Sequence, residues 1–174
     1  MDTPGVAGSD LVAVSDERSA AVGLAPLLAV CCGYFMVILD VTIVNVAAPA
    51  IGRDLGASLT DLQWIVDGYT VAFAGLLLFG GALGDRWGHR RVFCLGVAVF
   101  TVSSLGCAVA GGAITLTAFR LLEGCGAALL VPGSLALLQQ VYRTPSARAR
   151  AFGLWGAIAG AATFTMVTSR MTMK

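Results

Sequence analysis

At 174 residues the chain has the length of one domain, but its composition argues against a soluble one. Hydrophobic residues make up 57% of it and charged residues 12%, with a mean hydropathy of +0.86, as is typical of a chain whose main solvent is lipid. The formal net charge is only +1 and the arginines are scattered, which argues against a DNA or RNA partner. We therefore predict an all-α membrane protein.

The first 23 residues differ from everything that follows. They mix Gly, Ser, Asp and Ala and offer too little apolar surface to offset the entropy of ordering, so residues 1–23 are predicted to be a disordered tail. A cleaved signal peptide begins with positive charge and a short apolar core, whereas here an acidic tail precedes a much longer apolar run. No cleavage is expected.

Five apolar runs follow the tail, most of them about as long as a hydrocarbon core of roughly 30 Å requires. They predict membrane spans over residues 24–50, 62–83, 92–114, 116–141 and 151–169. The last run becomes polar after Ala162. Together they form one predicted membrane domain over 24–169, followed by a divergent end at 170–174.

The positions of the basic residues predict how the spans are oriented. Cytoplasmic segments are enriched in Lys and Arg, and most of the 11 basic residues fall on the side of the tail: Arg18, Arg86, Arg90, Arg91, Arg143, Arg148 and Arg150. We therefore expect a multi-pass protein of the cell membrane with a cytoplasmic N-terminus.

Four ionisable residues lie inside the predicted spans: Asp40, Asp67, Arg120 and Glu123. A charge at the centre of a spanning helix costs roughly 2.5 to 3.5 kcal/mol on insertion scales, so such residues usually face a cavity or a partner. Burial favours the neutral form of a carboxylate and a nearby guanidinium favours its charged form. A buried acid beside an arginine can therefore exchange a proton for a cationic substrate without covalent catalysis.

Each of these residues also has a purely structural interpretation. Arg120 and Glu123 are three residues apart on one predicted helix, so they can neutralise each other near the outer interface. Asp67 lies within a turn or two of the external end of its span and can be solvated there. Asp40 lies deepest, where a structural role is the alternative to a functional one.

A charged, glycine-rich stretch separates the second and third predicted spans. Its glycines permit close helix approach and unusual backbone angles, and its charged groups lie at a membrane edge. We predict a cytoplasmic hinge built from Gly81, Gly84, Asp85, Arg86, Gly88, Arg90 and Arg91.

This stretch also carries a family resemblance. The pattern Gly81-x-Leu83-Gly84-Asp85-Arg86-x-Gly88-x-Arg90-Arg91 resembles the signature loop between the second and third helices of the major facilitator superfamily of secondary transporters. The resemblance extends over about residues 25–162. It implies that the spans form part of the N-terminal half of that fold and that the loop has a gating role.

Two further motifs resemble one branch of the superfamily, the fourteen-helix drug:proton antiporters of the EmrB/QacA type, and a third resembles the superfamily as a whole. Residues 39–47 with Pro49 are similar to its first-helix motif, and residues 63–69 to its second helix. Residues 120–128 resemble the fourth-helix motif of the superfamily, represented here by Arg120, Gly124, Gly126 and Pro132. The resemblance implies that Asp40, Asp67 and Arg120 handle protons or cations.

Two departures from the family pattern bear on activity. Glu123 stands where the family more often has glutamine, and an extra acid beside Arg120 puts the free positive charge of that arginine in doubt. The glycine-proline motif of the fifth helix is absent, since residues 163–174 contain neither Gly nor Pro, as a frameshifted or truncated gene would produce. We expect a chain that does not transport alone and whose partner is the remainder of the transporter.

The predicted function is proton-coupled efflux of lipophilic or cationic drugs, driven by the proton motive force and without a bound cofactor. The alternative is a membrane-embedded scaffold without transport activity. An enzyme is not expected, because the chain has neither a phosphate-binding GxxxxGK[ST] loop nor an HExxH motif. All five cysteines lie in apolar runs without CxxC spacing and are predicted to be small buried residues instead of metal ligands.

Overall fold

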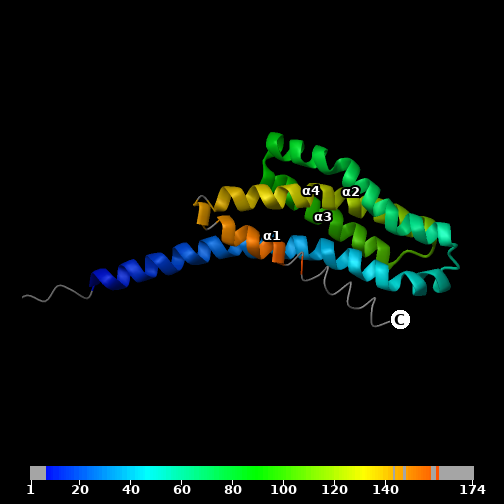
Figure 1. The fold of residues 1–174 in the computed structure, drawn as a ribbon, viewed down its shortest axis with the longest axis horizontal. Coiled ribbons are helices and arrows are strands. Elements are labelled where there is room, and N and C mark those ends of the chain that lie inside the picture. Colours follow the sequence, from blue (N-terminus) through cyan, green and yellow to red (C-terminus); the bar gives the residue numbers. More distant parts are fainter. Residues whose placement is uncertain (1–6, 143, 147, 158–159, 161–174) are drawn as a thin grey trace, which may run out of the picture.

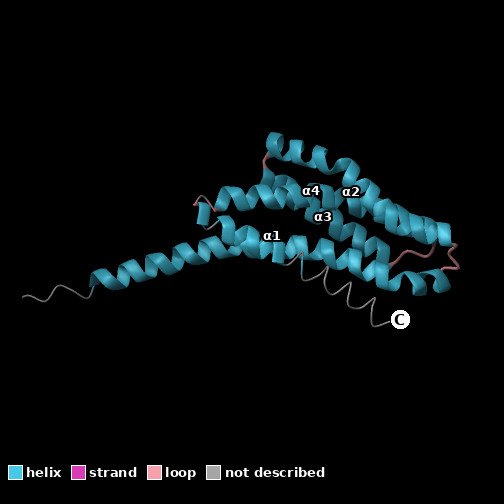
Figure 2. Ribbon diagram, viewed as in Figure 1, coloured by secondary structure: helices cyan, strands magenta, loops and turns pink. Residues whose placement is uncertain are grey.

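The computed structural model describes the backbone of residues 7–142, 144–146, 148–157 and 160, and side chains from Leu27 onward within these ranges. Its regular elements are helices (Figures 1 and 2). In chain order they are α1 (Ala7–Asp54), α2 (Leu59–Trp87), α3 (His89–Ala108) and α4 (Ala113–Val141), followed by helical backbone at residues 148–157. The prediction of an all-α architecture is confirmed.

Four helical segments are long and apolar enough to cross a membrane: Leu27–Asp54, Leu59–Trp87, His89–Ala108 and Ala113–Val141. They correspond to the first four predicted spans. Of the fifth, predicted over 151–169, the structure describes only residues 151–157 and 160, and the divergent end at 170–174 lies outside the described residues.

The helix boundaries differ from the predicted ones at both ends of the first span. Helix α1 begins at Ala7, so residues 7–23 are helical where we predicted a disordered tail, while residues 1–6 lie outside the description. Ala, Leu, Glu and Arg in this segment are good helix formers, and extending an existing helix costs far less than starting one. At the other end α1 runs to Asp54, which leaves a short link before α2.

The predicted hinge at residues 81–91 is almost entirely helical. Helix α2 continues to Trp87 and α3 starts at His89, so the turn is reduced to Gly88, whose φ of 91° is a conformation that favours glycine. The reason is that backbone groups near lipid need internal hydrogen bonds. The Gly88 amide donates such a bond to the Gly84 carbonyl at 2.9 Å.

Helix α4 packs against both α2 and α3 through glycines. A Cβ atom at Gly96 of α3 would lie 2.8 Å from the Leu130 amide nitrogen, and one at Gly126 of α4 would lie 2.7 Å from the Phe100 amide nitrogen. Larger residues would therefore separate the two helices. Close backbone contact of this kind holds helices together in lipid, where the hydrophobic effect contributes little.

The cysteines are not all buried as predicted. Cys31 is buried, but Cys32 and Cys94 are exposed and the other two are intermediate. An exposed thiol costs little on a helix face that meets lipid, because lipid is as apolar as the interior.

Candidate functional site

The structure brings together three of the four ionisable residues predicted inside the spans. One nitrogen of Arg120, Nη1, donates a hydrogen bond to Asp40 Oδ2 at 2.5 Å and another to Glu123 Oε2 at 2.7 Å. Both contacts are also ion pairs. We call Asp40, Arg120 and Glu123 the charge cluster.

Two helices position this cluster. Arg120 and Glu123 are three residues apart on α4, so their side chains leave the same face of that helix. Asp40 comes from near the middle of the first span, Leu27–Asp54. The side chains of Arg120 and Glu123 are 2% and 1% exposed, whereas that of Asp40 is 13% exposed. Asp40 is therefore the member of the cluster that remains accessible.

Helix α2 completes the surroundings of Arg120. Its Ile65 carbonyl accepts a hydrogen bond from Arg120 Nε at 3.3 Å, and the guanidinium carbon lies 4.4 Å from the centre of the Tyr69 ring, within the range of a cation–π interaction. Sequence analysis assigned no role to either residue. Their spacing of four places both on one face of α2, which is the signal that could have linked them.

Glu123 has a second partner that sequence analysis missed. The Cys107 thiol of α3 donates to Glu123 Oε2 at 3.5 Å, and no signal in the sequence points to this contact. The other oxygen, Glu123 Oε1, is buried and has no hydrogen-bond partner among the described atoms. Buried polar atoms are rarely left in that state, so this oxygen is where a proton would be held most readily.

The charges of the cluster do not balance. When both acids are ionised, one guanidinium faces two carboxylates, which leaves one negative charge in excess at bilayer depth. Such a charge is costly in a medium of low dielectric constant. Uptake of one proton or one monovalent cation makes the cluster neutral.

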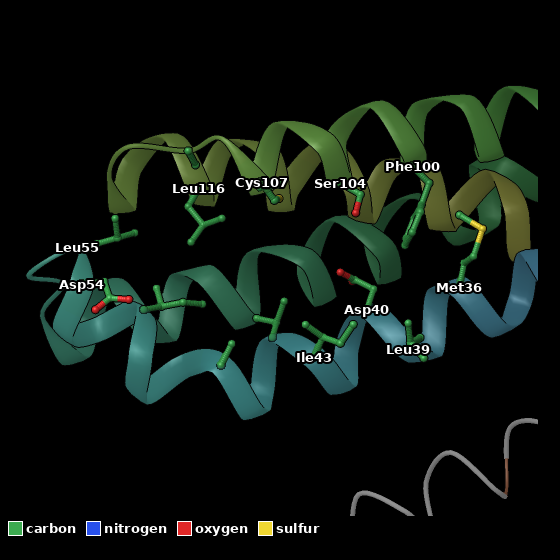
Figure 3. A pocket seen from close by; sticks show the side chains of 15 residues that line it. Met36, Leu39, Asp40, Ile43, Asp54, Leu55, Phe100, Ser104, Cys107 and Leu116 are labelled. Atoms are coloured by element: carbon green, nitrogen blue, oxygen red, sulfur yellow. The ribbon is translucent and has the colours of Figure 1, made fainter.

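A cavity of about 520 Å³ gives access to Asp40. Figure 3 shows the Asp40 side chain pointing away from α1 into this space, toward Phe100, Ser104 and Cys107 of α3. The remaining walls are mostly aliphatic: Met36, Leu39, Ile43, Val44, Ala47, Ile51, Leu55, Ala108, Ala110 and Leu116 line it, with Asp54 at one end. An apolar cavity with two carboxylates, Asp40 within it and the exposed Asp54 at one end, suits a lipophilic cation.

Asp67 lies outside the charge cluster. It is exposed on α2 and lines a small pocket of about 240 Å³ with Gln63, Trp64 and Val71. The face of α2 that carries these residues is thus distinct from the face that carries Ile65 and Tyr69 toward Arg120.

The purely structural interpretation, in which Arg120 and Glu123 neutralise each other, describes only part of the arrangement. The two residues do form an ion pair, but Arg120 is shared with Asp40. Its positive charge is therefore not free, in agreement with the doubt raised by the extra acid. Mutual neutralisation of Arg120 and Glu123 would leave Asp40 without compensation.

The predicted hinge residues meet at the junction of α2 and α3. His89 Nε2 lies 3.2 Å from Asp85 Oδ1, and a Cβ atom at Gly84 would lie 2.5 Å from His89 Nδ1. Glycine at position 84 thus makes room for the imidazole. The side chains of Arg86, Arg90 and Arg91 are exposed around this junction.

The fourth-helix motif contributes packing surfaces. Gly124 lies against the Tyr69 carbonyl of α2, and Gly126 lies against the Phe100 backbone of α3. Pro132, inside α4, faces Gly81, where a Cβ atom would lie 4.0 Å from Pro132 Cβ. The hinge motif and the fourth-helix motif are therefore in contact.

Comparison with known proteins identifies the family. Residues 30–168 match the model of the Major Facilitator Superfamily. The chain is 46% identical over 146 residues to a methylenomycin A resistance protein of Bacillus subtilis (strain 168), an alignment that covers 84% of this chain and 31% of that protein. It is 41% identical over 156 residues to the puromycin resistance protein pur8 of Streptomyces alboniger, covering 87% of this chain and 31% of the relative.

A third relative is named for export itself. The tetracenomycin C resistance and export protein of Streptomyces glaucescens is 46% identical over 137 residues, which are 79% of this chain and 25% of that protein. The chain thus spans about a third or less of the length of these relatives. Its apolar helices and these matches make it a multi-pass membrane protein, and the chain belongs to the major facilitator superfamily.

Proposed function

We propose that the chain provides the proton- and cation-exchanging helices of a drug:proton antiporter of the fourteen-helix EmrB/QacA type. In this proposal the cluster is the exchange site and Asp40 is the group that meets the substrate. The observation that supports it best is one buried guanidinium shared by two carboxylates, one of which lines an apolar cavity.

The exchange follows from the charge count. With one proton bound the cluster is neutral, and a lipophilic cation entering the cavity beside Asp40 replaces that proton as the neutralising charge. When the cation leaves, the excess negative charge favours uptake of another proton. The only bond that breaks and re-forms is the O–H bond of the protonated carboxyl group, so the exchange needs no enzymatic activity and no cofactor. The proton motive force supplies the energy.

The class of substrate is inferred from two sources. The cavity walls are mostly apolar and carry two acids, Asp40 and Asp54, which suits lipophilic cations. The relatives are named for resistance to or export of antibiotics. Asp67, on the exposed face of α2, is proposed to act as a second cation- or proton-binding group only when the remainder of the transporter packs against that face.

Transport also requires a membrane orientation and further helices. We place the protein in the cell membrane with the N-terminus and the Arg86, Arg90 and Arg91 end in the cytoplasm, by the positive-inside rule. Alternating access in secondary transporters moves two helical units around a shared site. The described spans form material for one such unit, so the remainder of the transporter is the proposed partner, and the chain alone is not expected to transport.

The exchange chemistry can be tested on the 174-residue chain itself. Purified protein in detergent is titrated with tetraphenylphosphonium, a lipophilic cation, at several pH values. Because one proton competes with one cation, the affinity should rise by up to about tenfold per pH unit until the cluster is deprotonated. Proton release into a weak buffer should accompany binding.

Two matched neutral variants give the controls. Asp40→Asn removes the excess negative charge and should weaken binding by about tenfold or more and abolish its pH dependence. Asp67→Asn removes the same charge outside the cluster. The affinity of this cavity for the cation should stay within about twofold of that in the unmodified chain. An absence of cation binding at every pH would contradict the proposal and favour the membrane-embedded scaffold.

A further inference from the structure

A second cavity lies at the opposite end of the bundle from the α1–α2 link. It has a volume of about 510 Å³ and lies between α1, α3 and α4, at the end of the bundle where α3 begins and α4 ends. Its lining consists of Leu27, Ala29, Val30, Arg90, Phe93, Cys94, Leu137, Leu138, Val141 and Tyr142. We call it the arginine groove, because Arg90 is the only charged residue among the described residues that line it.

The composition of the groove restricts what can occupy it. Its walls are aliphatic and aromatic, while the guanidinium of Arg90 is exposed and forms no ion pair among the residues that the structure describes. An apolar molecule would leave this cation unused, and none of the described lining residues is an acid that could attract a cationic molecule. A molecule with an apolar chain and an anionic end matches both the apolar walls and the guanidinium of Arg90.

A second cation lies at the rim of the groove. Arg148 Nε donates a hydrogen bond to the Tyr142 carbonyl at 3.3 Å, and Tyr142 lines the groove. Arg91 adds a third guanidinium, exposed beside Arg90 but outside the lining. This end of the bundle thus concentrates positive charge at the edge of the apolar spans, where the headgroups of a bilayer lie.

We propose that the arginine groove binds an anionic phospholipid, with one acyl chain along the apolar walls and the phosphate on Arg90. Basic pockets between spanning helices are suited to anionic headgroups, and an acyl chain is the apolar group always present beside these helices. This site is separate from the charge cluster, so the inference does not depend on the proposed antiport. It implies that lipid composition acts on the α2–α3 junction, because Arg90 belongs to the first turn of α3.

The test uses the full chain reconstituted in phosphatidylcholine vesicles with trace spin-labelled phosphatidylglycerol or spin-labelled phosphatidylcholine. Electron paramagnetic resonance measures the fraction of labelled lipid immobilised by the protein. We expect the anionic lipid to associate about fivefold more strongly, as one guanidinium contact predicts. Equal association of the two lipids would overturn the proposal.

Variants separate the groove from general surface charge. Arg90→Gln should reduce the anionic preference to near that of phosphatidylcholine, whereas Arg91→Gln, an equal loss of charge outside the lining, should retain most of it. Ala29→Phe fills the groove from its exposed side without a charge change and should also reduce the preference. If Arg90→Gln and Arg91→Gln lower it equally, non-specific attraction is the explanation and the groove is not the site.

Two cysteines locate the bound lipid on the chain. Cys94 lines the groove and Cys32 does not, although both are exposed. In detergent, phosphatidylglycerol should slow alkylation of Cys94 by N-ethylmaleimide relative to Cys32, and soluble glycerol phosphate should not. Protection by glycerol phosphate alone would show that a free phosphate suffices, and unchanged reactivity of Cys94 would place the lipid elsewhere; either result overturns the proposal.

Discussion

The two faces of α2 lie beside ionisable groups in opposite environments, one buried and one exposed. On one face, Ile65 and Tyr69 cover Arg120, which is 2% exposed and shared by two carboxylates. On the other face, two residues along from Ile65, Asp67 is exposed beside Gln63 and Trp64. Both regions lie within apolar spans.

The two faces of α2 therefore differ in the origin of the charge that neutralises each ionisable group. The buried cluster is compensated almost completely inside this unit of four described spans, with one negative charge left over. Asp67 receives no ion-pair partner within the part of the chain that the structure describes. A role for Asp67 in proton or cation handling therefore depends on something that approaches α2 from outside, such as water, substrate or another helix.

The largest effect is expected when the buried cation is removed. Arg120→Ala leaves two carboxylates without their guanidinium, and breaking a buried ion pair in this way costs about 3 to 5 kcal/mol. We expect the free energy of unfolding, measured by circular dichroism during titration with sodium dodecyl sulfate, to fall by that amount. Asp67→Asn should change it by less than about 0.5 kcal/mol. Equal stability of Arg120→Ala and the unmodified chain would contradict the claim that Arg120 compensates the two buried carboxylates.

A smaller effect is expected from changing the packing of the two faces of α2. At Gly124 of α4, an added Cβ atom meets the Tyr69 carbonyl on the buried face, whereas at Gly75 of α2 nothing lies within 4 Å. Gly124→Ala should therefore lower the free energy of unfolding by about 1 to 3 kcal/mol. Gly75→Ala should be neutral or raise it by up to about 1 kcal/mol, because alanine favours helix. The same titration measures both, and a reversed order would refute the assignment of the faces.

The smallest effect concerns the aromatic ring over Arg120. Tyr69→Leu removes the cation–π contact, which contributes about 0.5 to 2 kcal/mol depending on its exposure to solvent. Tyr69→Phe keeps the ring and removes a hydroxyl that has no hydrogen-bond partner among the described atoms, so we expect a change below about 0.5 kcal/mol. Thermal unfolding of the three proteins in one detergent compares them. If the two variants lose equal stability, the ring does not act through Arg120.

Much of the fold was predictable, because hydropathy and span length are properties of the sequence alone. The first four spans were identified, but their ends were misplaced where helices run past the apolar segment. Residues 81–87 contain two glycines and two charges, which predicted a turn, yet they remain helical up to Gly88. The demand for internal hydrogen bonds near lipid outweighs the weak helix propensity of glycine.

The candidate site was predictable residue by residue but not as an arrangement. A charge inside an apolar run is visible in the sequence, so Asp40, Asp67, Arg120 and Glu123 could all be named. Which of them meet depends on the rotation of α1 and α2 about their axes, set by contacts such as Gly124 on the Tyr69 carbonyl. The Ile65 carbonyl and the Cys107 thiol complete the site, and neither residue type signals such a role.

The most direct measurement is infrared difference spectroscopy of the carboxyl groups when tetraphenylphosphonium binds. If the cluster exchanges its proton for a cation, binding should remove the band of one protonated carboxyl group in the unmodified chain and in Asp67→Asn, and remove none in Asp40→Asn. Loss of that band in Asp40→Asn but not in Asp67→Asn would contradict proton exchange at the charge cluster, because the exchangeable proton would then lie on the exposed face of α2.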